Sequence, residues 1–276
     1  MRIDAHQHFW DLSRFAYPWM PEGSLLCRDF LPVDLSPILA RNDMDGCVVV
    51  QATTVPEEAE WLFHLALQYD FISGVVCWLD LTAADLGNRL DDLQKNEKFA
   101  GVRHPVHDEA DPKWLLRPDV VRGLKELAKR NIPYDLLVRP VHLPFVYQLA
   151  EQLPELRMII DHIGKPEIAA HVMEPWSLDM ERLAGIPHMH VKLSGMVTEA
   201  QHNSWSAQDL RPYVQHVWNQ FGPERCVFGS DWPVCLLAAS WKEVLAACTQ
   251  ALGPVASDTR EGLMGLNAVR FYKLPV

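Results

Sequence analysis

The sequence contains no uncharged apolar run that approaches the roughly 20 residues needed to span a bilayer as a helix. It also has no cluster of lysine and arginine, and its 36 acidic and 25 basic residues leave a formal net charge of −11. Nucleic acid and anionic membrane surfaces are bound through concentrated positive charge, so neither is expected as a partner. A small molecule is the expected partner, and the sequence does not indicate an oligomeric state.

Cysteine is sparse, and its spacing carries no motif. The six cysteines include no CxxC pair, and several lie within apolar runs. This usage favours buried, reduced thiols. The N-terminus lacks a basic segment followed by an apolar stretch and a cleavage site, so no secretion signal is expected. Together these absences predict a cytoplasmic protein.

Repeats, low-complexity tracts and Pro/Gly/Ser-rich linkers are absent as well. A length of 276 residues suits one barrel-sized domain, and an apolar share of 49% is ample for a large core. The charged share of 22% is ordinary for a globular protein, so disorder is not expected. We therefore expect a single domain that covers residues 1–276.

Short apolar runs alternate with longer amphipathic segments along the whole chain. Most of the runs, such as CVVVQ and RMIID, are continuous, as in strands of a parallel sheet that are buried on both faces. The eight predicted strands are Arg2–His8, Gly46–Ala52, Ile72–Asp80, Ala100–Pro105, Tyr134–Arg139, Arg157–His162, His190–Ser194 and Cys226–Asp231. Helical patterns between them include Glu57–Gln68, Leu86–Lys95, Val120–Arg130, Leu143–Gln152, Leu210–Phe221 and Ser240–Ala251.

This alternation predicts an α/β fold with the architecture of a (β/α)₈ TIM barrel. A doubly wound open sheet is the alternative, but no GxGxxG turn follows the first strand. Asp209 is expected to cap the helix that begins at Leu210, and Gly222 to end it. The segment Phe9–Pro32 is long for a βα loop, and it would lie over the C-terminal face of the barrel, where active sites form.

Two histidines stand at the end of the first strand. His6 and His8 are two residues apart, so on a regular strand they share a face, and Asp4 shares it with them. A single buried histidine is usually a core residue, but two in alternation directly before a long loop are harder to explain by packing. Imidazoles in this position serve as metal ligands, proton carriers or oxyanion donors.

Ionisable residues also end later strands. Asp231 follows the last apolar run, and strand eight lies beside strand one once a barrel closes, so this carboxylate could face the two histidines. An N-cap or an Asx turn before Trp-Pro is the structural alternative for Asp231. Asp161 and His162 end strand six and would face opposite sides of a continuing strand, and we expect His162 to enter the interior.

Further lining residues are expected at the same rim. Arg103 and His104 end strand four, and one of them should face inward; arginine offers a fork of donors suited to carboxylate or hydroxyl oxygens. The remaining candidates for substrate binding are Gln51, Trp78, Lys165 and Trp232. A solvated loop lysine is the alternative for Lys165, and a core position is the alternative for Trp232.

Several motifs together resemble a known family. RIDAHQHFW, DHIGKP, KLSG and FGSDWPVCLLAAS are similar to motifs of the amidohydrolase superfamily, and more narrowly of its sugar-lactonase branch, which includes fuconolactonases and rhamnonolactonases. The resemblance runs from the first strand to the last. It implies a distorted, amidohydrolase-like barrel and an enzyme of sugar-acid catabolism, a carboxylic ester hydrolase that opens an aldonolactone such as L-fuconolactone or L-rhamnonolactone.

The resemblance also implies roles for residues. His6, His8, His162 and Asp231 would be catalytic, with Asp231 as general base and the imidazoles stabilising the oxyanion. The same four would suit one divalent ion such as zinc. No lysine or glutamate ends strand four and no histidine ends strand five, so a binuclear centre is not expected, and a metal would be optional. A metal-dependent decarboxylase or amidase of this superfamily is one alternative, and a non-catalytic sugar-binding barrel is another.

Overall fold

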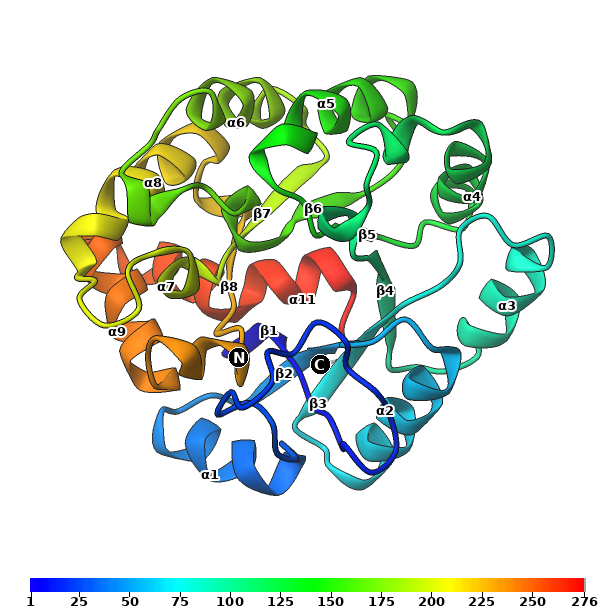
Figure 1. Ribbon diagram of the computed structural model, residues 1–276, viewed down its shortest axis with the longest axis horizontal. Helices are drawn as coiled ribbons and strands as arrows, with labels where there is room; N and C mark the ends of the chain where they lie inside the picture. The colour runs from blue at the N-terminus through cyan, green and yellow to red at the C-terminus, as the bar shows by residue number, and fades with distance from the viewer. Residues whose placement is uncertain (276) are drawn as a thin grey trace.

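Eight parallel strands form the centre of the molecule, in a computed structural model that describes residues 1–275. They follow one another around the sheet in sequence order, and helices surround them (Figure 1). The strands are β1 Ile3–Gln7, β2 Gly46–Val50, β3 Ile72–Cys77, β4 Phe99–His104, β5 Tyr134–Leu136, β6 Met158–Ile160, β7 Met189–Leu193 and β8 Cys226–Phe228. The prediction of a (β/α)₈ barrel is confirmed.

Hydrogen bonds between the two ends of the chain close the barrel. The backbone N–H of Asp231 donates to the carbonyl of His6 at 2.8 Å, and the N–H of His8 donates to the carbonyl of Trp232 at 2.7 Å. The segment after β8 thus runs beside the end of β1, as the barrel prediction required.

A β-bulge interrupts β1 next to the histidines. Asp4 pairs with Cys47 of β2 and Gln7 pairs with Val49, so β1 carries one extra residue across this step. An extra residue reverses the face on which later side chains lie. His6 and His8 therefore point into the barrel while Asp4 points out of it, contrary to the expectation that the three share a face.

The outward-facing Asp4 is bound by groups from the C-terminal part of the chain. Its carboxylate accepts hydrogen bonds from the Ser230 hydroxyl at 2.5 Å and from the indole N–H of Trp241 at 2.8 Å. Asp4 is fully buried, and burial raises its pKa to about 6. Its role is to tie β1 to the region after β8.

Helices cover the outside of the barrel. They are α1 Pro32–Arg41, α2 Pro56–Gln68, α3 Leu86–Leu93, α4 Pro118–Lys129, α5 Leu143–Gln152, α6 Trp176–Ala184, α7 Met196–Glu199, α8 Ala207–Phe221, α9 Trp241–Leu252 and α10 Ser257–Glu261. The last helix, α11 Asn267–Tyr272, lies instead across the middle of the ring of strands (Figure 1). Gly222 ends α8, as predicted. The N-cap of α8 is Ser206 instead of Asp209, whose carboxylate accepts from the Ser206 N–H at 2.8 Å. The helix therefore begins earlier than its apolar pattern indicated.

The loop between β1 and α1 covers one end of the barrel. It is the dark-blue segment that passes in front of the strands in Figure 1. Trp10 and Phe30 pair across its base through two backbone hydrogen bonds of 3.0 Å, and the indole N–H of Trp19 donates to the carbonyl of Ala52 at 2.7 Å. The prediction of a long loop here is confirmed. Among the described residues, no helix has the length and apolarity needed to cross a membrane.

Candidate functional site

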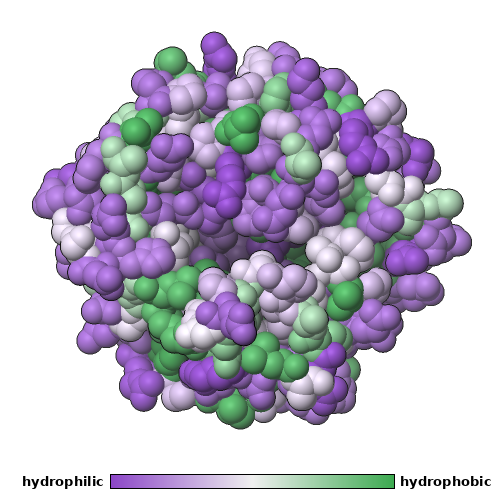
Figure 2. Space-filling model, viewed as in Figure 1, coloured by the Kyte–Doolittle hydropathy of each residue, from purple (hydrophilic) through white to green (hydrophobic). Residues whose placement is uncertain are grey.

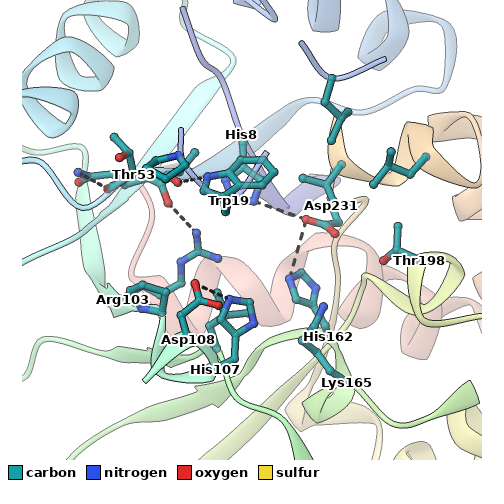
Figure 3. A pocket seen from close by; sticks show the side chains of 18 of the residues that line it. His8, Trp19, Thr53, Arg103, His107, Asp108, His162, Lys165, Thr198 and Asp231 are labelled. Atoms are coloured by element: carbon teal, nitrogen blue, oxygen red, sulfur yellow. Dashed lines mark hydrogen bonds and ion pairs between the residues drawn. The ribbon is translucent and has the colours of Figure 1, made fainter. Parts of the chain in front are cut away.

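Three imidazoles surround one carboxylate oxygen at the end of the barrel. The Nε2 atoms of His8, His6 and His162 lie 3.5, 3.8 and 3.9 Å from Oδ1 of Asp231. Figure 3 shows Asp231 between His8 and His162, with its carboxylate directed toward both rings. The four residues predicted to be catalytic thus form one cluster, although they come from three separate strand ends.

Left-handed backbone conformations place two members of this cluster. His162 has φ of 55° and Asp231 has φ of 59°, a region that residues other than glycine seldom adopt. β6 ends at Ile160, so the chain turns immediately after it. Asp161 and His162 are both buried and both face the barrel interior, because they do not lie on a continuing strand. The expectation that only one of them enters the interior is wrong.

Arg103 is the residue of the Arg-His pair that faces inward. One guanidinium nitrogen, Nη2, donates to the carbonyl of Gln51 at 2.6 Å, and Nη1 lies 3.4 Å from Nε2 of His6 and 3.5 Å from Oδ2 of Asp161. A permanent positive charge therefore stands beside the imidazole cluster.

His104 points away from the cavity. Its ring stacks on Trp114 with centroids 4.1 Å apart, and it contacts the Glu109 carboxylate at 2.7 Å through Nε2. The indole N–H of Trp78 donates to its Nδ1 at 3.0 Å. His104 thus supports Trp78 from behind, which corrects the expectation that His104 binds substrate directly.

A cavity of about 550 Å³ opens above the cluster. In Figure 2 this face of the molecule is hollowed near its centre. Seven of the predicted site residues line the cavity: His8, Gln51, Trp78, Arg103, His162, Lys165 and Asp231. The cavity is also lined by residues that were not predicted to bind substrate, among them Trp19, Thr53, His107, Asp108, Arg139, Thr198, Glu199 and His202. A cavity of this size accommodates a small polar ring.

Lys165 and Trp232 occupy different environments. Lys165 reaches the cavity and forms an ion pair with Glu199, so both remain close enough to meet substrate hydroxyls.

Trp232 is 1% exposed and packs edge-on against Phe30 and Phe9, with ring centroids 5.4 and 6.2 Å apart. Trp232 does not line the cavity, contrary to the expectation that it binds substrate; it holds the β1–α1 loop in place.

A buried charged group lies beneath the cluster, and the sequence reasoning missed it. Lys192 of β7 is fully buried, with Nζ 2.5 Å from Oδ2 of Asp135 and 2.8 Å from Oδ1 of Asp161. Tyr272 donates its hydroxyl hydrogen to the same oxygen of Asp135 at 2.8 Å. The sequence feature that could have predicted it is a lysine within an apolar strand run, because buried lysines are rare unless they are paired.

Burial determines the charge states of the cluster. It lowers the pKa values of His6 and His8, and it lowers the pKa of His162 to about 4. Burial alone would raise the pKa of Asp231, but the imidazoles, led by His162, outweigh it and hold that pKa below its ordinary value. Near neutral pH the cluster therefore consists of neutral imidazoles around an ionised carboxylate.

The depressed pKa of His162 predicts a loss of stability in acid. The unfolded chain takes up a proton as the pH falls through 6.5, whereas the folded protein does so only near 4. Stability from this group is therefore complete above pH 6.5 and is lost toward pH 4, by about 3 kcal/mol in total. The free energy of unfolding, measured by urea titration, should fall between pH 7 and pH 5 in both proteins. The fall should be about 2 kcal/mol smaller in His162→Gln than in the wild type. Equal drops in the two proteins would contradict this assignment.

Two groups of residues place their ligand atoms close enough together to hold a metal ion. One consists of His6, His8 and Asp231, and the other of His6, Asp161 and His162, with all ligand atoms of a group within 4.8 Å of one another. Both groups are buried, and both include His6.

Comparison with known proteins shows which family and which proteins this chain is similar to. A family model described as amidohydrolase matches residues 3–274. The chain is 39% identical to an L-fucono-1,5-lactonase of Burkholderia ambifaria, over 99% of this chain and 96% of that protein. It is 37% identical to an L-fucono-1,5-lactonase of Burkholderia multivorans, over 100% and 97%. A crystal structure of an amidohydrolase from Burkholderia multivorans with bound zinc covers 100% of both chains with a TM-score of 0.93 at 37% identity.

Proposed function

Because the chain belongs to the amidohydrolase family, as its motifs predicted, we propose that it hydrolyses the ring ester of an acid-sugar lactone such as L-fuconolactone or L-rhamnonolactone. It is thus a carboxylic ester hydrolase of sugar-acid metabolism. The observation that carries the proposal is the full-length similarity to two L-fucono-1,5-lactonases, combined with a carboxylate and three imidazoles that meet at one cavity.

Asp231 acts as the general base. A water molecule beside its carboxylate attacks the lactone carbonyl carbon, and Asp231 takes the proton that the water loses. The low pKa of Asp231 keeps it ionised, so the carboxylate is ready to accept at neutral pH. When the bond between the carbonyl carbon and the ring oxygen breaks, Asp231 returns that proton to the departing oxygen, and the open-chain acid is formed.

Positive and polar groups stabilise the oxyanion. Arg103 and the imidazoles stand around the position where the carbonyl oxygen gains charge, and in Figure 3 Arg103 faces the cluster from the opposite side of the cavity. Donors held in place before the reaction lower the barrier without reorganisation. Lys165 and Glu199 are placed to bind the hydroxyl groups of the sugar.

The donor set also fits one divalent ion. Nδ1 of His8 lies 2.6 Å from the carbonyl of Val50, so it carries the hydrogen and leaves a lone pair on Nε2, which faces Asp231 Oδ1 at 3.5 Å. A cation such as zinc, held there by His8, His6 and Asp231, would polarise the carbonyl. The fixed charge of Arg103, 3.4 Å from His6 Nε2, opposes a second cation, and we propose that the ion is not required.

Metal removal tests this part of the proposal. After chelation and dialysis, with residual metal measured, kcat/KM on the lactone should stay within about threefold of its starting value, because the fixed charge of Arg103 already stands beside the cluster. A loss beyond about 100-fold that zinc restores would contradict it.

The function itself is tested with a panel of aldonolactones. Fuconate, rhamnonate, galactonate and arabinonate lactones are assayed by acid release with a pH indicator. Turnover of at least one lactone is the expected result. Decarboxylation or amide hydrolysis that depends on zinc or manganese, without lactone hydrolysis, would favour another enzyme of the family. Binding of a lactone without acid release would favour a sugar-binding barrel.

A further inference from the structure

Lys192 lies in an unusual place for a lysine. Its side chain is fully buried, and its ammonium group contacts the imidazole cluster and two buried carboxylates. Besides its two carboxylate partners it has a third neighbour, Nδ1 of His6, at 3.1 Å. Removing charges from water is costly, and apolar residues of similar volume would often serve a core equally well. The contact with His6 is what apolar residues could not supply.

The contact with Lys192 determines which nitrogen of His6 carries hydrogen. An ammonium ion has three donors and no acceptor, so the nitrogen that it contacts must present a lone pair. Nδ1 of His6 also faces Oδ1 of Asp161 at 3.4 Å, but the lysine is closer. Lys192 also forms ion pairs with Asp135 and Asp161, at 2.5 and 2.8 Å. Nη1 of Arg103 is also a donor without an acceptor, and at 3.4 Å from Nε2 of His6 it favours the opposite tautomer, but the Lys192 contact at 3.1 Å is shorter. The closer donor therefore favours hydrogen on Nε2 of His6.

That hydrogen points toward the reacting groups. Nε2 of His6 lies 3.8 Å from Oδ1 of Asp231, on the side of the ring away from Lys192. His8 has the opposite arrangement, because its Nδ1 donates to Val50 and its Nε2 keeps the lone pair. Two histidines of one HxH motif thus have different tautomers, set by different partners.

We propose that Lys192 is a positioning residue that holds His6 as the Nε2–H tautomer, so that His6 donates a hydrogen bond to the lactone oxyanion and resists serving as a metal ligand through Nε2. The proposal deepens the lactonase function proposed above and rests on it for the identity of the oxyanion. The tautomer can be measured without any substrate.

The test begins with the wild-type protein. Histidine labelled with ¹⁵N distinguishes a nitrogen that carries hydrogen from one that does not, and the His6 signals are assigned by their loss in His6→Gln. At neutral pH we expect His6 to carry hydrogen on Nε2 and His8 on Nδ1. Hydrogen on Nδ1 of His6 overturns the proposal, whether or not the protein hydrolyses lactones. Absence of lactone turnover, with the expected tautomer, would instead remove the proposed function.

Variants then test the role of the lysine. Lys192→Met removes the donors but keeps the stem, so Nδ1 of His6 should gain hydrogen and donate to Asp161. We expect kcat to fall about 100-fold, with KM within about threefold. Zinc affinity, measured by competition with a chelator, should rise at least about tenfold because Nε2 is freed to ligate. A purely structural lysine would lower stability without changing the tautomer, and that result would refute the proposal.

Two further variants control for unpaired buried charge. Lys192→Met combined with Asp135→Asn removes the carboxylate charge that the single variant leaves uncompensated, and it should show the same tautomer change. Tyr272→Phe removes the hydrogen bond to Asp135 but leaves the contact between Lys192 and His6. Its His6 tautomer should match that of the wild type. If neither lysine variant folds, the wild-type spectrum alone decides.

Discussion

Asp231→Asn should lower kcat/KM for the lactone by about 10³–10⁴-fold while the protein stays folded. The amide has the size of the carboxylate and tolerates the left-handed backbone at this position, where φ is 59°. It cannot accept a proton from water, so base catalysis is lost while the imidazoles and Arg103 remain. Steady-state kinetics with the indicator assay measures the loss.

Asp43→Asn is the matched control for this variant. Asp43 also has a left-handed backbone, with φ of 54°, but it is exposed on the loop between α1 and β2. The same chemical change there should leave kcat/KM and the unfolding midpoint essentially unaltered. Full activity in Asp231→Asn would remove the general-base assignment, and equal losses in both variants would indicate a backbone effect instead of a catalytic one.

Gly195→Ala should be the most damaging glycine substitution near the site. A Cβ at Gly195 would lie 2.5 Å from Nδ1 and 2.6 Å from Cγ of His162, and φ is +62°. Overpacking costs about 1–3 kcal/mol and a left-handed residue about 1–2 kcal/mol more. Since His162 must move, we expect a loss of about 2–5 kcal/mol in the free energy of unfolding and about 100-fold in kcat/KM.

Substitutions at two other glycines separate backbone strain from the displacement of a site histidine. Gly222 has φ of +75° and ψ of 162°, and apart from its chain neighbours no atom lies within 4 Å of the added Cβ, so Gly222→Ala should cost about 1–3 kcal/mol through backbone strain alone, with unchanged kinetics. At Gly229 an added Cβ would meet the Cβ of His6 at 2.6 Å without a left-handed φ, so Gly229→Ala should reduce activity through displacement of His6. Urea unfolding and kcat/KM measure both effects. Unchanged kinetics in Gly195→Ala would show that His162 need not be held where it is.

Much of the candidate site could be predicted from the sequence, because strand ends in a barrel meet at one rim. His6, His8, His162 and Asp231 each follow an apolar run, so the barrel topology alone brings them together. The choice between Arg103 and His104 could not be made, since strand spacing gives alternation but not its phase. Lys192 and Asp135 could have been predicted as buried charged residues, because each interrupts a run otherwise typical of a buried strand.

The sequence by itself determined the architecture of this protein and the rim at which its chemistry lies, since hydrophobic periodicity and strand order are local properties of the chain. Only the tertiary structure decided which way the side chains point. The bulge in β1 that turns Asp4 outward and His6 inward is held by Ser230 and Trp241, more than 200 residues away. Pairing of Lys192 with Asp135 and His6 likewise requires three strands to meet. Such contacts form only when the barrel closes, so no local pattern encodes them.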